Sequence, residues 1–433
     1  MARIGSLKEH RQSLAALYTG APGPWEMANP IREYDWGSAG ALAAWQGREP
    51  SGRPEAELWM GAHPAAPSRL CQPDGGEVSL ADAIRADPVA MLGRECTARF
   101  GARLPFLLKV LAVARALSVQ VHPSQAQAAA GFAREQAICL PQAERVYVDP
   151  YAKPEMLVPV TEFAALAGLR QWDRVAQMLA RLDVPVLRPV LMRLNSQAGQ
   201  AGLAGVLAIL AAWPRARRSA LARMIRQRAC GLLGGAATGL DPDEQSSLEW
   251  IITLAGQHPE DPLVVAPLLL RLHRLRPGQA IYLPAGVPHA YLSGVGVEIM
   301  ASSDNVVRGG LTTKRVDSKA LADLLAPDAA PLLDVPRVTL GPYEVRWRPP
   351  VADFALSRVA VTDVPVALSR GPRDPAGPEV LLCLNGKVTV SSDGGDVSLR
   401  SGHSAFLSAA ASPAVLAGRG EVYRATIGRA RPS

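Results

Sequence analysis

The chain has 433 residues, 48% of them hydrophobic and 20% charged, which is ordinary for a globular protein with two or three domains. Its five cysteines are scattered and include no CxxC pair, which argues against a disulfide framework or a cysteine-ligated zinc. The N-terminus lacks a signal-peptide run and no segment approaches the roughly 20 apolar residues of a membrane span, so we expect a cytoplasmic protein.

The first third of the chain reads as strands with a few helices. We interpret residues 1–29 as an N-terminal extension, and the β-like pattern begins near Pro30. Apolar residues at helical spacing predict helix between Ser79 and Phe100, and an Ala-rich stretch predicts another. The remaining strongly apolar runs are predicted to be central strands. The ranges are 79–100 and 126–136 for helix, and 104–113 and 116–122 for strand.

From Glu162 to about Gln257 the apolar period becomes helical, with Pro and Gly breaks between segments. This block predicts a helical insertion for packing and shielding. It also carries the densest basic run of the chain, from Arg215 to Arg228. That run has helical spacing and no interleaved aromatic residues, so we interpret it as an exposed helix face rather than a nucleic-acid site; the net charge of +7 is otherwise spread along the chain.

Two further stretches have the pattern of tight β-structure. In residues 276–314, Pro-Gly turns separate short β-rich runs and place His289 directly after a turn. The tail from about Val335 is β-rich again and reads as a degenerate copy of the same hairpin. When Gly402 is set against Gly278, the position of His289 is filled by Pro413. The second copy would then keep the scaffold without the histidine.

Polar side chains on these strands point to a metal site. Gln120 and His122 are two residues apart, so in a strand both point to one face. With His289 and Glu155 they form a nitrogen and oxygen ligand set suited to zinc or another divalent ion. By spacing alone, a role of His122 as a buried core histidine is favoured over metal binding.

Several charged residues near these ligands offer further chemistry. Arg308 can clamp a phosphate, and Lys109 and Lys314 are mobile point charges. Each of these cations could instead be an ordinary surface residue. Asp304, in the sequence Ser-Ser-Asp-Asn, could be either a turn residue or a general base.

Taken together, the motifs resemble type I mannose-6-phosphate isomerase (phosphomannose isomerase), a family of zinc enzymes in the cupin class. The resemblance spans residues 30–320, with the groups in the family's order. The motifs that carry it are Tyr34-Asp-Trp-Gly, Ala56-Glu-Leu-Trp-Met-Gly, Leu104-Pro-Phe-Leu-Leu-Lys-Val-Leu, Leu117-Ser-Val-Gln-Val-His-Pro, Lys153-Pro-Glu-Met, Pro288-His-Ala-Tyr and Ser303-Asp-Asn-Val-Val-Arg-Gly-Gly-Leu-Thr-Thr-Lys.

The resemblance implies a mainly β fold of two cupin-type β-barrels (jelly rolls) with an α-helical insertion. The implied catalytic barrel comprises residues 30–161 and 258–334, the insertion 162–257, and the degenerate C-terminal barrel 335–433. Zn²⁺, or another divalent metal, would bind to Gln120, His122, Glu155 and His289. The implied catalytic residues are Arg308, Asp304 and Lys153, and the implied substrate-binding residues are Trp36, Lys109, Ser118, Glu298 and Lys314.

One departure concerns the catalytic groups. The family normally has His before the Lys-Pro-Glu motif, whereas this chain has Ala152. That histidine has been considered for ring opening or proton transfer. Either Lys153 and Asp304 suffice in this chain, or its rate is reduced.

The implied reaction interconverts mannose 6-phosphate and fructose 6-phosphate by metal-assisted proton transfer through a cis-enediol, within carbohydrate metabolism and GDP-mannose biosynthesis. A phosphosugar would be its small-molecule partner, with no nucleic acid or membrane, and the protein would be a monomer. Two alternatives stay open: a related cupin isomerase acting on another phosphosugar, and a non-catalytic cupin that binds metal or sugar. A bifunctional nucleotidyltransferase is disfavoured because the chain has no Gly-rich phosphate loop.

Overall fold

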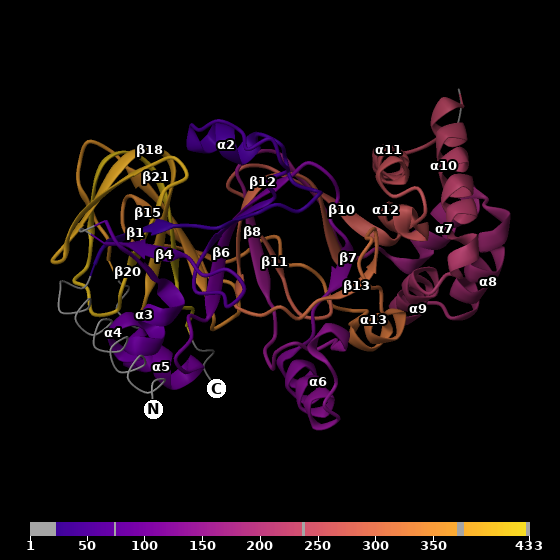
Figure 1. Cartoon of the computed structure of the whole chain (residues 1–433). Coiled ribbons are helices and arrows are strands. Elements are labelled where there is room, and N and C mark those ends of the chain that lie inside the picture. Colours follow the sequence, from indigo (N-terminus) through magenta and orange to yellow (C-terminus); the bar gives the residue numbers. More distant parts are fainter. Residues whose placement is uncertain (1–22, 73–74, 236–238, 370–375, 430–433) are drawn as a thin grey trace. The chain divides into compact units, whose positions relative to one another are not determined.

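The computed structural model describes residues 23–72, 75–235, 239–369 and 376–429. The chain divides into two compact units, each described by itself below (Figure 1). The first comprises Met1–Ala112, Val297–Ser302 and Asp334–Ser433, and the second comprises Val113–Gly296 and Ser303–Leu333. Within the described ranges, no helix combines the length and the apolar character that crossing a membrane requires.

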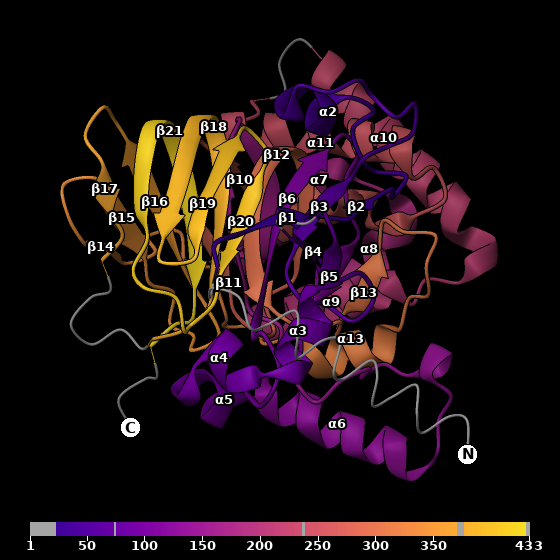
Figure 2. The same ribbon diagram turned by 60° about the vertical axis from the view of Figure 1, so that its left-hand side comes forward.

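A large antiparallel sheet dominates the first unit. Its main path runs β14-β15-β16-β21-β18-β20-β1-β4-β5, with β17 and β19 paired at its side. Figure 2 shows β16, β21, β18 and β19 side by side in yellow. The strands are β1 (Trp25–Ala28), β4 (Arg69–Cys71), β5 (Glu77–Ser79), β14 (Arg337–Thr339), β15 (Glu344–Trp347), β16 (Ala355–Val361), β17 (Val366–Ala367), β18 (Glu379–Ser392), β19 (Gly395–Arg400), β20 (Ser404–Leu407) and β21 (Val415–Thr426).

The β-rich tail is confirmed, because β14–β21 all lie in it. Alternating side chains of these strands, such as Val388, Val390 and Leu416, are buried in one hydrophobic cluster. The N-terminal extension predicted for residues 1–29 is described only at its end. Residues 1–22 lie outside the described ranges, whereas Trp25–Ala28 are not an extension but strand β1, paired with β20 and β4.

The remaining elements of the first unit are β2 (Ile31–Arg32), β3 (Glu57–Met60), β6 (Phe106–Val113), α2 (Ala41–Gln46), α3 (Leu80–Ala86), α4 (Pro88–Leu92) and α5 (Arg94–Phe100). Helix was predicted across 79–100, and three short helices occupy it. Asp87 caps α4, which begins at Pro88. Gly93, with a φ of 85°, separates α4 from α5. All eight residues of β6 are buried, as expected of a central strand.

The second unit contains an antiparallel sheet in which the long strand β12 has the central position. Strand β12 pairs with β9 and β7; β9 continues to β10, β7 to β13, and β8 pairs with β11. The strands are β7 (Val119–Val121), β8 (Glu155–Pro159), β9 (Phe163–Leu169), β10 (Leu270–Leu275), β11 (Ile281–Leu283), β12 (His289–Ala301) and β13 (Val307–Gly310). The last residues of β12, Val297–Ala301, belong to the first unit.

Helices supply the rest of the second unit. Residues spaced three and four apart, such as Val175, Met178, Leu179 and Leu182, are buried together in its core, as predicted. Four 3₁₀ turns lie between them: η1 (Gln142–Glu144), η2 (Pro185–Leu187), η3 (Arg215–Arg217) and η4 (Pro262–Val265). The helices are α6 (Gln125–Ala137), α7 (Trp172–Leu182), α8 (Arg188–Ser196), α9 (Gln200–Ala211), α10 (Arg218–Gly234), α11 (Pro242–Gln257), α12 (Ala266–Leu269) and α13 (Ser318–Leu324).

The prediction of helix from Glu162 onward is wrong for its first residues. Phe163–Leu169 form strand β9, and α helix begins only at Trp172. The reason is visible in the burial of β9: six of its seven residues are buried, so both faces are covered and no helical period can be read from them.

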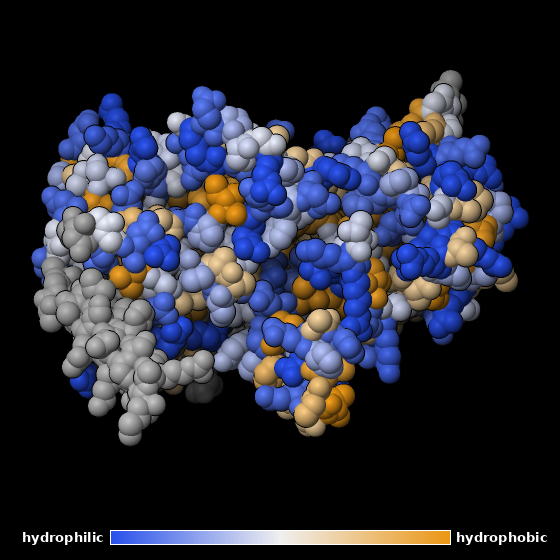
Figure 3. Space-filling model, in the orientation of Figure 1, coloured by the Kyte–Doolittle hydropathy of each residue, from blue (hydrophilic) through white to orange (hydrophobic). Residues whose placement is uncertain are grey.

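The protein is therefore sheet-rich with a helical block. Figure 3 shows mainly hydrophilic residues on the face in view, with apolar residues scattered among them. Exposed large apolar side chains of the described residues, such as Ile138 and Met192, come from separate segments.

Candidate active site

Three potential metal ligands meet inside the second unit. His122, Glu155 and His289 each offer a ligating atom, and these atoms lie within 4.8 Å of one another. The three side chains are at most 2% exposed. His122 directly follows β7, Glu155 begins β8 and His289 begins β12, so three strand ends converge here.

Strand pairing brings Gln120 to the same place. Gln120 lies opposite His289 in the β7–β12 pair, and its amide nitrogen is 3.2 Å from His289 Nε2. Val119 and Val121, which alternate with it, are fully buried in the hydrophobic cluster of the unit. The predicted alternation along this strand is therefore confirmed, and Gln120 and His122 share the face that looks toward His289 and Glu155.

The main chain fixes the orientation of both imidazoles. His122 Nδ1 is 2.8 Å from the carbonyl oxygen of Asn305, and His289 Nδ1 is 2.9 Å from that of Val287. A carbonyl oxygen can only accept, so each Nδ1 carries a proton and donates it. Each Nε2 is then left with a lone pair that points toward the shared centre, the arrangement in which histidine binds metal.

Two of the side-chain atoms that face the centre of the cluster lack hydrogen-bond partners among the described residues. His122 Nε2 is 3.2 Å from Glu155 Oε1, and His289 Nε2 is 3.4 Å from Glu155 Oε2. Nevertheless, His122 Nε2 and Glu155 Oε2 are buried and make no hydrogen bond in the described part of the chain. Buried polar atoms without partners are costly, and here they face one another across a common point.

The protonation states suit a cation. Burial lowers the pKa of His122 to about 4, because burial, helped by the charge of Lys153, outweighs the charge of Glu155, which raises that pKa. Burial raises the pKa of Glu155, but Lys153, His122 and His289 outweigh it and hold that pKa well below its usual range. Lys153 Nζ lies 3.0 Å from Glu155 Oε1. The site thus presents a neutral His122 imidazole and an ionised Glu155 carboxylate, the forms that bind a metal ion.

A second layer of residues, which the sequence did not reveal as such, supports His122. Asn305 is buried and accepts from the backbone N–H of Val148 at 2.9 Å, and its amide donates to the carbonyl oxygens of Asp149 and Tyr151 at 2.8 Å. The carboxylate of Asp149 in turn accepts from the Ser303 hydroxyl at 2.9 Å and from the Asp304 N–H at 2.8 Å. These bonds hold the carbonyl group that orients His122.

The other predicted residues of this unit lie at different depths. Arg308 is half-buried on β13, opposite Gln120 in the β13–β7 pair. Ser118 is half-buried immediately before β7, and Lys153 is 12% exposed beside Glu155. Asp304 and Lys314 are exposed.

The remaining predicted residues lie in the first unit. Lys109 on β6 is buried, with its Nζ 3.3 Å from Glu298 Oε2 and 3.6 Å from Glu57 Oε2. Its Nζ also lies 5.2 Å from the ring centre of Trp59. Trp36 is half-buried and stacks on Tyr34 with ring centres 5.8 Å apart. The structure therefore brings together two predicted residues, Lys109 and Glu298. Glu57 and Trp59, which also contact Lys109, were not predicted from the sequence.

Comparisons with known proteins agree on one family. The family model described as "Phosphomannose isomerase type I, catalytic domain" matches residues 25–172. Mannose-6-phosphate isomerase of Escherichia coli (strain K12) is 36% identical over 405 residues, which cover 92% of this chain and 98% of the relative. That of Candida albicans is 31% identical over 405 residues, covering 84% and 88%.

Solved structures give the same result. An alanine mutant of phosphomannose isomerase from Salmonella typhimurium is similar with a TM-score of 0.83 and 31% identity, covering 94% of this chain and 100% of that chain. A crystal structure of mannose 6-phosphate isomerase bound with zinc and yttrium has a TM-score of 0.82, the same identity and the same coverage.

Proposed function

Because the chain belongs to the type I phosphomannose isomerase family, we propose that it interconverts mannose 6-phosphate and fructose 6-phosphate. The observation that carries this proposal is that the side chains of His122, Glu155 and His289 meet in the interior, with their ligating atoms within 4.8 Å of one another. The mannose-6-phosphate isomerases of Escherichia coli and Candida albicans align with 92% and 84% of the chain, which supports the same activity here.

The proposed metal is Zn²⁺, although the donor set would also accept another divalent ion. The fit rests on the two Nε2 lone pairs and on the inner atoms of His122 and Glu155 that lack hydrogen-bond partners. Gln120 completes the set, since rotating its amide places the oxygen where the nitrogen lies. A similar protein has been solved with zinc bound. Such an ion would act as a Lewis acid toward sugar oxygens.

The chain's own residues would then move the proton. Isomerisation requires a base that shifts a proton between C1 and C2 through a cis-enediol. Our candidates are Asp304 and Lys153. Lys153 has the stronger structural support, because it is nearly buried and 3.0 Å from Glu155, whereas Asp304 is exposed. We assign Arg308 to the developing charge or the phosphate.

The remaining predicted residues would hold the substrate. We propose that Trp36, Lys109, Ser118, Glu298 and Lys314 contact the sugar or its phosphate. We also propose that the protein acts as a cytoplasmic monomer on this small molecule without nucleic acid.

We further propose that the β-structure comprises two cupin-type barrels with the boundaries predicted above. The repeat is supported by two matching glycines: Gly278 lies just before β11 and Gly402 just before β20, with φ values of 80° and 81°. The left-handed conformation favours glycine at both positions.

The proposed activity is tested with purified protein and a matched pair of variants. We expect turnover of mannose 6-phosphate, and we expect His289→Ala to lose both bound metal and activity. The matched control is His273, a half-buried histidine on β10 that donates to the Ala167 carbonyl group. The His273→Ala variant should keep both its bound metal and its activity. Assays with mannose, glucose and fructose 6-phosphates identify the substrate. Inactivity on mannose 6-phosphate would contradict the proposal, and full metal occupancy in His289→Ala would contradict the ligand set.

Ala152 keeps a related isomerase in view as the second candidate. Ala152 lies three residues before Glu155, and its backbone N–H donates to Gln125 Oε1 at 3.1 Å. A longer side chain at position 152 would therefore begin close to the candidate metal site. We expect Ala152→His to raise kcat on mannose 6-phosphate if a helper group is absent, by about 10²-fold if it acts as a general acid–base catalyst. An unchanged kcat would show that another residue does that work, and Ala152→Gln controls for size.

A further inference from the structure

The second unit contains a hollow that the proposed activity does not use. It has a volume of about 450 Å³, within the range of roughly 300–1,000 Å³ typical of small-molecule sites. Its lining comes from the start of β9, the end of β10, the middle of β12 and α11. Beside the apolar Phe163 and Leu275, it comprises Glu162, Ala164, Trp250, Arg274, Arg276 and Ser293.

None of the metal ligands lines this hollow, and its Ala164 and Trp250 lie on the face of the sheet opposite to those ligands. Ala290 alternates with His289 on β12 and pairs with Leu166 on β9. Ala290 and Leu166 both belong to the cluster that packs beneath the helices, and Ala164 and Trp250 pack against that same cluster. The side chain of His289 points the opposite way, toward Glu155. The hollow is therefore distinct from the candidate active site.

Two arginines give the hollow a positive charge. Arg274 and Arg276 are both exposed, and neither forms an ion pair with another described residue. Arg274 donates to the Ser246 hydroxyl at 3.1 Å, which ties one end of its guanidinium to α11. A guanidinium held in this way keeps further N–H groups for an oxyanion, and paired arginines favour phosphate.

The rest of the lining suits a ring that bears hydroxyl groups. Trp250 is half-buried, so its indole is fixed by the core while part of it remains accessible. An indole offers a flat apolar surface for a base or a sugar ring. The Glu162 carboxylate and the Ser293 hydroxyl can bond hydroxyl groups, and the carboxylate disfavours a bare polyanion.

We propose that this hollow is a binding site for a phosphate ester attached to a ring, with the phosphate on Arg274 and Arg276 and the ring on Trp250. Nucleotides and sugar phosphates share this chemistry. The proposal does not depend on the proposed isomerase activity, because it involves none of the same side chains.

The test is calorimetric titration of the His289→Ala protein, in which the proposed active site is disabled, with ADP, glucose 6-phosphate and inorganic phosphate. We expect one of the esters to bind with a dissociation constant of about 1 mM or tighter. Tighter binding of ADP would identify a nucleotide site, and tighter binding of glucose 6-phosphate a sugar-phosphate site. His289→Gln serves if the alanine variant does not fold.

Matched variants locate the binding. Arg274→Gln/Arg276→Gln should weaken ester binding about tenfold or more while leaving isomerase activity intact. Arg271→Gln, an exposed arginine on the same strand outside the hollow, should bind like the parent. The proposal is overturned if neither ester binds, if inorganic phosphate binds as tightly as both, or if the double variant and the Arg271 variant behave alike.

Discussion

Asn305 contacts a candidate metal ligand through its main chain and the surrounding loop through its side chain. Its carbonyl oxygen accepts from His122 Nδ1, while its side chain bonds the main chain at Val148, Asp149 and Tyr151. The side chain therefore fixes the position of the carbonyl group, and the carbonyl group fixes the imidazole. Partners of this kind contribute to metal affinity without touching the ion.

We predict that Asn305→Ala weakens metal binding about 10- to 100-fold, because the loop that carries the carbonyl group loses its anchors. Competition against a chromophoric chelator measures this directly. Asp304→Ala is the matched control, since its bond to Asp149 is made by a backbone N–H that the substitution retains. Equal metal affinity in the two variants would show that Asn305 serves only the fold.

The convergence of the candidate ligands could be predicted from the sequence, whereas this outer layer could not. Strand alternation pairs Gln120 with His122 within one short motif. The motif resemblance then favoured a metal role for both, together with Glu155 and His289. The bonds between Asn305 and Asp149 connect residues 156 positions apart. Nothing in the local pattern around Asp149 distinguishes it from any aspartate before a proline, so only the folded chain shows its role.

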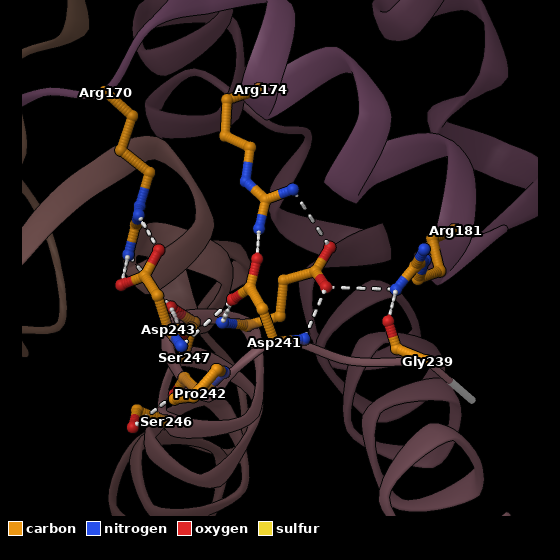
Figure 4. Close-up of polar contacts among 10 residues, drawn as sticks. Arg170, Arg174, Arg181, Gly239, Asp241, Pro242, Asp243, Ser246 and Ser247 are labelled. Carbon is orange, nitrogen blue, oxygen red and sulfur yellow. Dashed lines mark hydrogen bonds and ion pairs between the residues drawn. The ribbon is translucent and has the colours of Figure 1, made fainter. Parts of the chain in front are cut away.

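At the level of elements, three arginines hold the start of α11 (Figure 4): Arg170, which lies between β9 and α7, and Arg174 and Arg181 of α7. Arg170, only 7% exposed, makes a two-pronged contact with Asp243 and also donates to the Ser247 hydroxyl at 2.9 Å. Further along, Arg174 contacts Asp241, and Arg181 donates to Glu244 at 3.0 Å. Asp241 and Glu244 also form a capping box, so each carboxylate both caps the helix and binds a cation.

We predict that Asp243→Ala lowers the free energy of unfolding by about 1–3 kcal/mol, because the nearly buried Arg170 guanidinium loses its charged partner. The half-exposed position of Asp243 keeps the effect below that of a fully buried pair. Urea denaturation measures the change. Glu249→Ala, an exposed carboxylate on the same helix, should shift the unfolding free energy by less than about 0.5 kcal/mol. Equal effects of the two substitutions would contradict the prediction.

Element types were easiest to predict where one face is buried and the other exposed. The helical period of α7 is explicit in Val175, Met178, Leu179 and Leu182. Strand β9 was misassigned because Phe163–Leu169 is covered on both sides and consists largely of Ala and Leu, which favour helix as readily. Tertiary pairing with β10 and β12 decides the structure of that segment.

At the scale of the whole molecule, the candidate metal site should contribute to global stability. Three strand ends of the second unit converge on it, and the unsatisfied atoms there gain partners only when a cation binds. An ion present at about 100 times its dissociation constant stabilises the folded state by about 2.7 kcal/mol. In a chain of 433 residues, this corresponds to a Tm change of about 3 °C.

We therefore predict that chelation lowers the Tm by a few degrees and that added Zn²⁺ restores it, as measured by calorimetry. The His289→Ala variant provides the control, because its Tm should not respond to either treatment. A parent protein with the same Tm before and after chelation, at verified metal loss, would exclude a stabilising ion at this site.

The two histidines owe their orientation to the main chain, since the acceptors at Val287 and Asn305 are carbonyl oxygens. Any amino acid supplies that oxygen, so a side-chain exchange at Val287 leaves the acceptor of His289 unchanged in kind. An inserted or deleted residue in either loop would instead displace it. Over evolutionary time these loops should therefore vary in composition more freely than in length.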